Sequence, residues 1–261
     1  MRIWYQGYVP TGFDPAWETA EKYTVRYAQK VARPDTTVDI HGVEKLAARM
    51  VDSEYIQYLH VSQVLEKVLQ AEQEGYDAVC IGGTLDLGHI LLREILDIPI
   101  VFIAESSFHA ACLLARKFGI VSTQEGILRR QMELVKYHGL EQRCIPGIHL
   151  GATMVEIGEL LGNDPKRFIN MFHEASRKLI SAGAGAIVPG QGFVGAFFGE
   201  QGVHDVDGIP IVDTMAILIK TAEMLVDLQK LGMKRSRAGQ YAYASKEELL
   251  AARKLYGVGY K

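Results

Sequence analysis

Short apolar runs alternate with longer amphipathic segments along this chain. The short runs are rich in β-branched and aromatic residues and predict strands at residues 2–6, 77–82, 99–104, 118–123, 185–190 and 210–213. The longer segments have helical spacing, as in 61–75, where Val61, Val64, Leu65 and Val68 share one face. Because this alternation is typical of parallel sheets joined by βαβ crossovers, the pattern predicts an α/β fold.

Residues at the ends of two predicted helices support this interpretation. The segment 163–183 has Asn163 or Asp164 as its N-cap, Pro165 in its first turn and a glycine at its end. The segment 61–75 also ends at a glycine, which is a common helix stop.

An internal repeat suggests how the elements are organised. Residues 74–88 are similar to residues 181–195, since both contain a helix end, a strand and a glycine-containing turn, and at an offset of 108 Gly83 falls opposite Gln191. The tetrapeptide IPIV follows each copy at nearly the same offset. Two matches at one offset predict two similar α/β halves. Ligands of open parallel sheets lie beyond the carboxyl ends of the strands, so we expect both turns to face one cleft between the halves.

Composition and charge narrow the class of partner. The chain has 261 residues, 48% of them hydrophobic and 23% charged, with a formal net charge of -3. This charge lacks the basic excess on which nucleic-acid and anionic-membrane binding depend. No apolar run reaches the ~20 residues that span a bilayer, and the first residues do not resemble a signal peptide. We therefore expect a cytoplasmic protein with a small-molecule substrate, no nucleic acid and no membrane partner.

Cysteine and histidine spacings give no sign of a metal or a bound cofactor. Cys80, Cys112 and Cys144 are odd in number, have apolar neighbours and form no C-x-x-C pair, so we expect reduced, buried thiols. The eight histidines show no H-x-H or H-E-x-x-H spacing. No phosphate-binding loop lysine and no G-x-G-x-x-G at a helix start are present. We expect no metal and no cofactor.

Five stretches match the pattern of a known enzyme family. They are GYDAVCIGGTLDLG at 75–88, the segment 96–123, YHGLEQR at 137–143, GAIVPGQG at 185–192 and GIPIVDTMAILIKTAEML at 208–225. In their combined spacing they resemble the aspartate/glutamate/hydantoin racemase superfamily, from about residue 1 to 228. The resemblance implies two α/β domains related by a pseudo-twofold axis, with the ligand cleft between them. Their expected boundaries are 1–105 plus 213–261 for the first domain and 106–212 for the second.

The sequence departs from this family where the reaction takes place. Racemases of the family use one cysteine at the end of each of two symmetry-related strands as acid and base. Those positions fall on Gly83 and Gln191, and Asp86 and Gly88 fit the family pattern without a gap. Neither glycine nor glutamine transfers a proton at neutral pH. Cys80 lies three residues earlier and is expected to point to the opposite face of the strand. The resemblance therefore implies a member without catalytic cysteines.

Neutral polar groups gather at the expected cleft. Gln6 and Gln191 either bind the ligand through their amides or only tie down their own loops. Ser106 or Ser107 is expected to cap a helix, and either caps it only or also helps to bind an anion there. Glycines of the two turns allow close approach of a ligand to the backbone. The complete predicted binding set is Gln6, Tyr8, Gly83, Thr84, Ser106, Ser107, Ser122, Thr123, Gly190, Gln191 and Gly192.

Two titratable residues are catalytic candidates. Glu105 lies at a strand end, where burial would raise its pKa, although it could equally brace the turn. His204 lies in the glycine-rich segment 192–208, which contains Phe193, Phe197 and Phe198. We expect this segment to be a loop with exposed aromatic side chains, either a lid over the cleft or a subunit contact.

Three functions are compatible with these residues. The first is an enzyme of this superfamily that acts on a carboxylate, cyclic amide or imide without catalytic cysteines. The second is a hydrolase, lyase or decarboxylase on the same scaffold, and the third is an inactive small-molecule binding protein. Residues 234–261 combine a basic segment with a short amphipathic helix, which predicts a solvated surface. Tyrosines in this tail suggest packing on a neighbouring subunit, so we expect a homo-oligomer.

Overall fold

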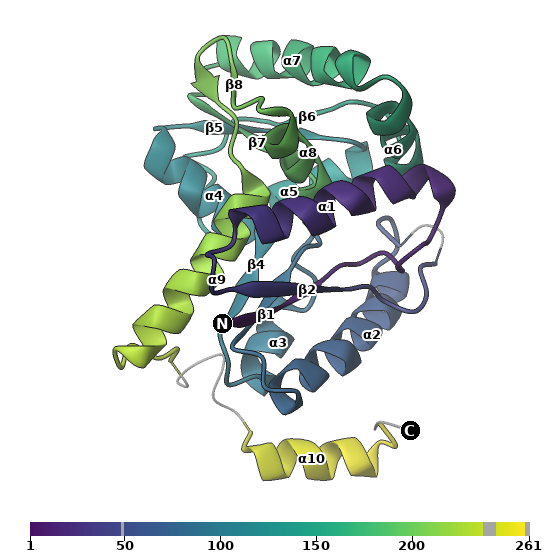
Figure 1. Ribbon diagram of the computed structural model, residues 1–261, viewed down its shortest axis with the longest axis vertical. Coiled ribbons are helices and arrows are strands. Elements are labelled where there is room, and N and C mark those ends of the chain that lie inside the picture. The colour runs from purple at the N-terminus through teal and green to yellow at the C-terminus, as the bar shows by residue number, and fades with distance from the viewer. Residues whose placement is uncertain (48–49, 237–243, 259–261) are drawn as a thin grey trace.

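The computed structural model describes residues 1–47, 50–236 and 244–258, and in them two parallel sheets form the centre of the molecule (Figure 1). The first sheet has the order β2-β1-β3-β4 and the second the order β6-β5-β7. The strands are β1 (Arg2–Gln6), β2 (Thr37–His41), β3 (Ala78–Ile81), β4 (Ile100–Phe102), β5 (Phe118–Ser122), β6 (Ile148–His149) and β7 (Ala186–Pro189). A small antiparallel hairpin joins β8 (Asp205–Val206) to β9 (Ile209–Pro210). The predicted α/β fold is confirmed.

All but one of the predicted strands are present in these sheets. At 210–213 the structure forms only the end of β9 and a single parallel bridge between Ile187 and Ile211. Strands β2 and β6 are not among the predicted strands. Both lie at sheet edges and are only partly buried, so they lack the continuous apolar run that marks the buried strands.

The two sheets repeat one arrangement of strands. In the first, β1 lies between β2 and β3, and in the second, β5 lies between β6 and β7. The bridge from Ile187 to Ile211 puts the second IPIV segment beside β7, as β4 lies beside β3. The internal repeat in the sequence thus corresponds to a repeated topology.

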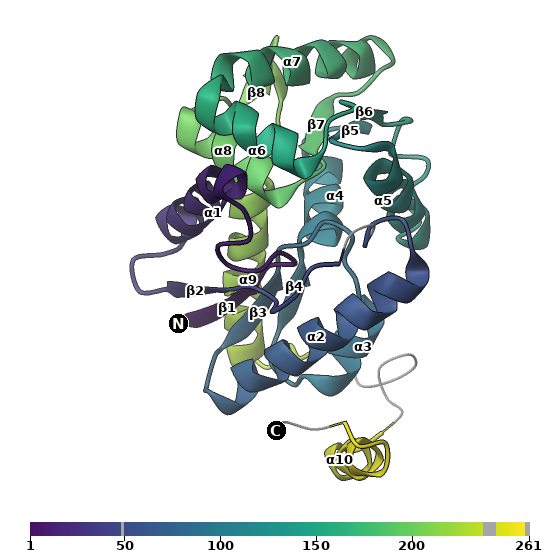
Figure 2. The same cartoon turned by 90° about the vertical axis from the view of Figure 1, so that its right-hand side faces the viewer.

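Helices cover the sheets and connect the two halves (Figure 2). The first IPIV segment leads into α4 and the second into α9, and these two helices pack against each other. The helices are α1 (Glu18–Val31), α2 (Glu54–Gln73), α3 (His89–Ile95), α4 (Ile103–Leu114), α5 (Glu125–Tyr137), α6 (Met154–Asn163), α7 (Pro165–Ser181), α8 (Gly192–Gln201), α9 (Thr214–Lys230) and α10 (Lys246–Leu255), with a 3-10 turn at Pro15–Trp17. Within the described ranges, no helix is long and apolar enough to cross a membrane.

The sequence predicts the start of α7 correctly and the start of α2 too late. The Asp164 side chain accepts a hydrogen bond from the Arg167 backbone N–H and caps α7, as predicted. The helix predicted to begin at residue 61 begins earlier, at Glu54, where Ser53 is the N-cap. The first turns of α2 carry exposed tyrosines, so they lack the amphipathic pattern used for the prediction.

The C-terminal helix α10 lies at one end of the molecule (Figure 1). It has a capping box at Ser245 and no buried residue, and its Arg253 pairs with Glu66 of α2. Of the tyrosines in the predicted subunit contact, Tyr256 is exposed, and Tyr241, Tyr243 and Tyr260 lie outside the described residues. The homo-oligomer stays a prediction.

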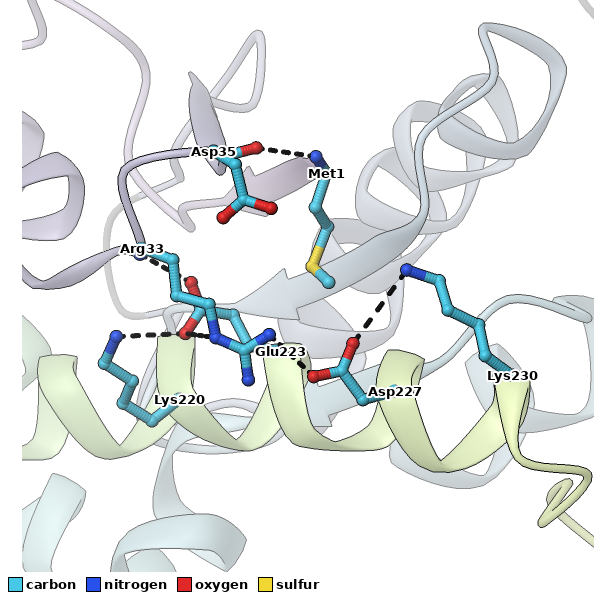
Figure 3. A network of polar contacts seen from close by, with 7 residues as sticks. All are labelled: Met1, Arg33, Asp35, Lys220, Glu223, Asp227 and Lys230. Atoms are coloured by element: carbon cyan, nitrogen blue, oxygen red, sulfur yellow. Dashed lines mark hydrogen bonds and ion pairs between the residues drawn. The ribbon is translucent and has the colours of Figure 1, made fainter.

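A buried carboxylate joins α9 to the segment between α1 and β2 (Figure 3). Glu223 is fully buried and accepts a hydrogen bond of 2.7 Å from the Arg33 backbone N–H. Lys220 Nζ lies 3.0 Å and Arg33 Nε 3.4 Å from the same carboxylate, and Asp227 binds Arg33 Nη1 at 2.6 Å. Because an unpaired buried charge is costly, these contacts hold the chain after α1 on α9.

Replacement of Glu223 tests this link. We expect Glu223→Ala to lower the free energy of unfolding by about 2 kcal/mol, because it removes the acceptor of a backbone N–H while the cations can be hydrated. Lys220→Ala removes only an exposed partner and is expected to cost less than about 0.5 kcal/mol. Urea unfolding of both variants measures the two values, and equal losses would contradict the assignment.

Candidate functional site

A cavity of about 320 Å³ opens between the two halves. Residues that follow β1, β2 and β3 line it from the first half, and residues that follow β5 and β7 line it from the second. Both Gly83 and Gln191 border it. This is the position expected for a ligand beyond the carboxyl ends of parallel strands.

The wall of the cavity is largely apolar. Its apolar side chains come from the segments after β1 and β2 and from the second half, and include Phe13, Trp17, Leu46, Met50, Met154 and Phe193. No lysine or arginine occurs among the described lining residues. Glu21 is the carboxyl group in this lining, and its Oε2 accepts a hydrogen bond of 3.2 Å from the Gly12 backbone N–H.

Tyrosine rings occupy the space where side chains of the first turn would lie. A Cβ atom on Gly83 would overlap the ring of Tyr8, and one on Gly82 would overlap the Tyr5 side chain. The Tyr8 hydroxyl donates a hydrogen bond of 3.2 Å to the Leu87 carbonyl, which fixes the ring in place. A side chain at either position would therefore have to displace a tyrosine side chain.

The second turn meets the first across the cleft. A Cβ atom on Gly192 would lie only 3.2 Å from the carbonyl oxygen of Gly82, so the two backbones are close neighbours. The first N–H groups of α8 have no intrahelical acceptor, as in any helix, and the side chain of the N-cap Gln191 does not cap them. Its Nε2 donates to Ser122 Oγ at 3.2 Å. The cavity thus borders a helix N-terminus and an anchored amide.

The structure brings five predicted binding residues to the cavity. Tyr8, Gly83, Thr84, Gln191 and Gly192 line it. Thr84 also lines a second, much smaller cavity behind the first, together with Ser107 and Gly190. Ser122 and Thr123 are buried beside Gln191 and the lining residue Gln124, and Thr123 Oγ1 has no hydrogen-bond partner in the described chain.

Gln6 has a structural role. Its side-chain amide donates to the backbone oxygen of Gly7 at 2.9 Å and accepts a hydrogen bond from the Trp4 indole at 3.0 Å. The residue is fully buried and does not line the cavity. Of the two roles left open for this amide, the structure supports the one in which it ties down its own loop.

The expected serine cap of α4 is wrong. The helix begins at Ile103, and the Asp86 carboxylate accepts hydrogen bonds from the backbone N–H groups of Ala104 and Glu105 at 3.1 and 2.8 Å. Burial raises the pKa of Asp86 to about 7, while these two bonds oppose the rise. Ser106 lies within the helix and donates to the Phe102 carbonyl. Since Asp86 already occupies this helix N-terminus, no anion of the ligand is needed there.

The two catalytic candidates lie away from the cavity. Glu105 forms an ion pair with Arg93 of α3, so it braces the start of α4 and does not line the cavity. His204 is exposed beside the β8–β9 hairpin and is absent from the lining as well. Neither residue is therefore placed to contact a ligand in this cavity.

The predicted aromatic loop is a buried helix. Residues 192–201 form α8, and Phe193, Phe197 and Phe198 are buried in the core of the second half. Gly195 and Gly199 allow this close packing, because a Cβ atom there would overlap Thr214 and Tyr27 respectively. The exposed lid and the exposed subunit contact expected here are therefore wrong.

All three cysteines are free, and none lines the cavity. Cys80 is fully buried on β3, with its Sγ 3.8 Å from the Leu218 carbonyl, and burial raises the pKa of its thiol. Cys112 and Cys144 are partly buried in the second half, and burial raises their pKa values too, to about 12 for Cys144. Such thiols are poorly suited to acid–base catalysis at neutral pH.

Sequence reasoning missed several lining residues. Tyr5 lies inside a strand, and only the sheet neighbours decide which face it occupies. Trp17 and Leu46 lie in segments without regular periodicity, at the start of α1 and after β2. The cluster of aromatic residues in the first 17 positions was the sequence feature that could have indicated these lining residues.

Substitution at Gly83 tests the packing of the first turn. We expect Gly83→Ala to lower the free energy of unfolding by about 1–3 kcal/mol, because its Cβ overlaps the Tyr8 ring. In a Tyr8→Ala background the same change is expected to cost clearly less, since the obstructing ring is gone. A double-mutant cycle from urea unfolding measures the difference. Additive losses would show that the ring does not occupy this space.

The pH dependence of stability tests the burial of His60 behind Tyr8. His60 packs edge-on against Tyr8 at 5.5 Å, neither ring nitrogen has a partner among the described residues, and burial lowers its pKa. Below about pH 6.5 the unfolded chain takes up a proton that the folded protein refuses. Stability therefore falls with falling pH, by at most about 1.4 kcal/mol per pH unit for one proton.

His60→Phe is expected to reduce this fall between pH 7.5 and 5.5. It cannot abolish the fall, since burial also lowers the pKa values of His41, His89, His138 and His173. Urea unfolding of both proteins at the two pH values provides the comparison. An unchanged pH dependence would mean that His60 is protonated to the same extent in the folded and the unfolded protein.

Comparison with known proteins places this geometry in a family. The family model for Asp/Glu/hydantoin racemases matches residues 16–222. A hydantoin racemase of Pseudomonas sp. (strain NS671) is 30% identical over 232 residues, which cover 88% of this chain and 89% of that protein. The fold is shared with the allantoin racemase of Klebsiella pneumoniae, with 24% identity, a TM-score of 0.78 and 94% coverage of both chains. The chain belongs to the Asp/Glu/hydantoin racemase family.

Proposed function

We propose that this family member acts on a cyclic amide or imide with an apolar substituent, and that it works without a catalytic thiol. The observation that carries the proposal is the cavity itself. Both turns of the repeat border it, and no cysteine, lysine or arginine is found among its described lining residues.

The charge of the lining favours a neutral ligand. The carboxylate of a free amino acid or of a dicarboxylate would have no lysine or arginine partner in the described wall, and a buried unpaired charge is unfavourable. The carbonyl and N–H groups of an imide need only neutral donors and acceptors, which the Gln191 amide and the start of α8 provide. Apolar residues such as Phe13, Leu46 and Met50 suit a hydrocarbon substituent.

The curated relatives point to the same class of substrate. A hydantoin racemase of Paenarthrobacter aurescens is 26% identical over 230 residues, in addition to the relative from Pseudomonas. A hydantoin is a cyclic imide, so these names agree with the neutral lining of the cavity. We infer that a 5-substituted hydantoin is a suitable probe for this protein.

The proposed reaction begins with proton removal from the carbon next to a carbonyl. The alignment that places Gly83 and Gln191 at the thiol positions of the family leaves no sulfur for this step. Glu21 is the carboxyl group in the described lining, and we assign it the role of proton acceptor. The electron pair of the broken C–H bond moves onto the carbonyl oxygen. Once the acid form of Glu21 has exchanged its proton with water, its return to the same face replaces the hydrogen on carbon by a solvent-derived one. A proton delivered from water to the opposite face inverts the carbon instead.

Hydrogen exchange at the reacting carbon tests the function. With 5-benzylhydantoin in deuterated water, we expect the protein to accelerate loss of the C5–H signal in nuclear magnetic resonance spectra. A variant with Cys80→Ala, Cys112→Ser and Cys144→Ser is expected to retain the rate within about twofold, because none of these thiols lines the cavity. Glu21→Gln is expected to lower the rate roughly 100-fold.

Binding of the same probe is measured by calorimetry as a control. Glu21→Gln keeps an oxygen acceptor for the Gly12 N–H, so its affinity is expected to stay close to that of the parent protein. Gln191→Ala removes a lining amide and is expected to weaken binding about tenfold. Binding without exchange by the parent protein would favour the inactive binding protein, and absence of binding would exclude this substrate class.

A further inference from the structure

The Tyr5 side chain reaches the floor of the cleft from β1. Neighbouring residues of a strand point to opposite faces, and Tyr5 shares the face of Ile3, which is covered by α1 and α9. Tyr5 is only 5% exposed, and it lines the main cavity. Its ring is therefore held by the core while part of the side chain reaches the ligand space.

The Tyr5 hydroxyl lies where the two glycine turns meet. A Cβ atom on Gly82 would overlap this hydroxyl, and one on Gly192 would lie 3.8 Å from it. Both glycines line the cavity. The hydroxyl thus lies beside both turns of the repeat, at the boundary between the two halves.

This hydroxyl differs from the other buried tyrosine hydroxyls. Tyr8 donates to the Leu87 carbonyl, Tyr27 to Asp213 and Tyr76 to Asp39. For Tyr5, no hydrogen-bond partner is found within residues 1–47, 50–236 and 244–258. Since buried tyrosine hydroxyls usually find a partner, this donor remains available to a molecule in the cavity.

We propose that the Tyr5 hydroxyl donates a hydrogen bond to a carbonyl oxygen of the ligand, at the point where Gly82 and Gly192 approach each other. The proposal deepens the function proposed above and rests on it. It adds a binding residue in β1, a strand in which Gln6 was the residue expected to bind the ligand.

The environment of Tyr5 makes it a donor and excludes it as a base. Burial raises the pKa of its phenol, so the proton stays on the oxygen across the physiological pH range. When Glu21 takes the proton from carbon, the electron pair of the C–H bond moves to the carbonyl oxygen. The hydrogen bond from Tyr5 then acts on a developing negative charge and becomes stronger. Tyr5 is therefore expected to affect turnover more than ground-state binding.

Tyr5→Phe removes the hydroxyl and keeps the ring that packs against Gly82. We expect the affinity for 5-benzylhydantoin to fall about tenfold, which corresponds to about 1.4 kcal/mol. The exchange rate at saturation is expected to fall by at least a further tenfold, because the bond strengthens as charge develops. The matched control is Tyr76→Phe, which removes another hydroxyl from an equally buried tyrosine outside the cavity lining. It is expected to leave both values unchanged.

The outcomes separate this proposal from the proposed function. If the parent protein binds 5-benzylhydantoin and Tyr5→Phe binds and exchanges it equally well, the role of Tyr5 is wrong and the substrate class stands. If the parent protein binds phenylacetate and not the hydantoin, the substrate class is wrong, and weaker binding of phenylacetate by Tyr5→Phe still supports the donor. If neither probe binds, both proposals fail. Circular dichroism of each variant confirms that the fold is intact.

Discussion

The close approach of two glycine turns determines what this site can be. Gly192 lies against the carbonyl of Gly82, and no side chain fits between the two backbones. The space that side chains of the first turn would fill is taken by Tyr5 and Tyr8, which come from the N-terminal part of the chain. Because protein interiors are closely packed, the turn at Gly82 and Gly83 must be complementary in shape to the segment that contains Tyr5 and Tyr8.

This packing couples position 83 to the loop that follows β1. A side chain at position 83 and the Tyr8 ring would occupy the same volume, so Gly83 and Tyr8 fit each other in shape. The backbone oxygen of Leu87 fixes Tyr8 through its hydroxyl, and His60 supports the ring from α2. The Tyr8 ring therefore fills the space beside Gly83 and leaves no void at this turn.

The sequence was informative where periodicity and topology decide the outcome. Alternating strands and helices predict the α/β fold, and the repeat places Gly83 and Gln191 at one cleft because parallel strands end at the same edge. It was misleading where contacts with residues distant in the sequence determine the local structure. Residues 192–201 form a buried helix because the glycines of α8 pack closely against Tyr27 and Thr214, which are distant in the sequence. The cap of α4 likewise comes from Asp86, which is distant in the sequence from the serines near the start of that helix.

The two halves share a topology, yet they offer different chemistry to the cleft. The first half contributes tyrosines and the carboxyl group of Glu21, and the second contributes the Gln191 amide and the start of α8. A helix N-terminus carries partial positive charge and attracts a carbonyl oxygen or an anion, whereas a carboxyl group can accept a proton. A ligand with two carbonyls, such as an imide, would therefore be held in one orientation. Under the proposed function the bond to be broken faces Glu21, so the two halves of the fold have different roles in the proposed chemistry.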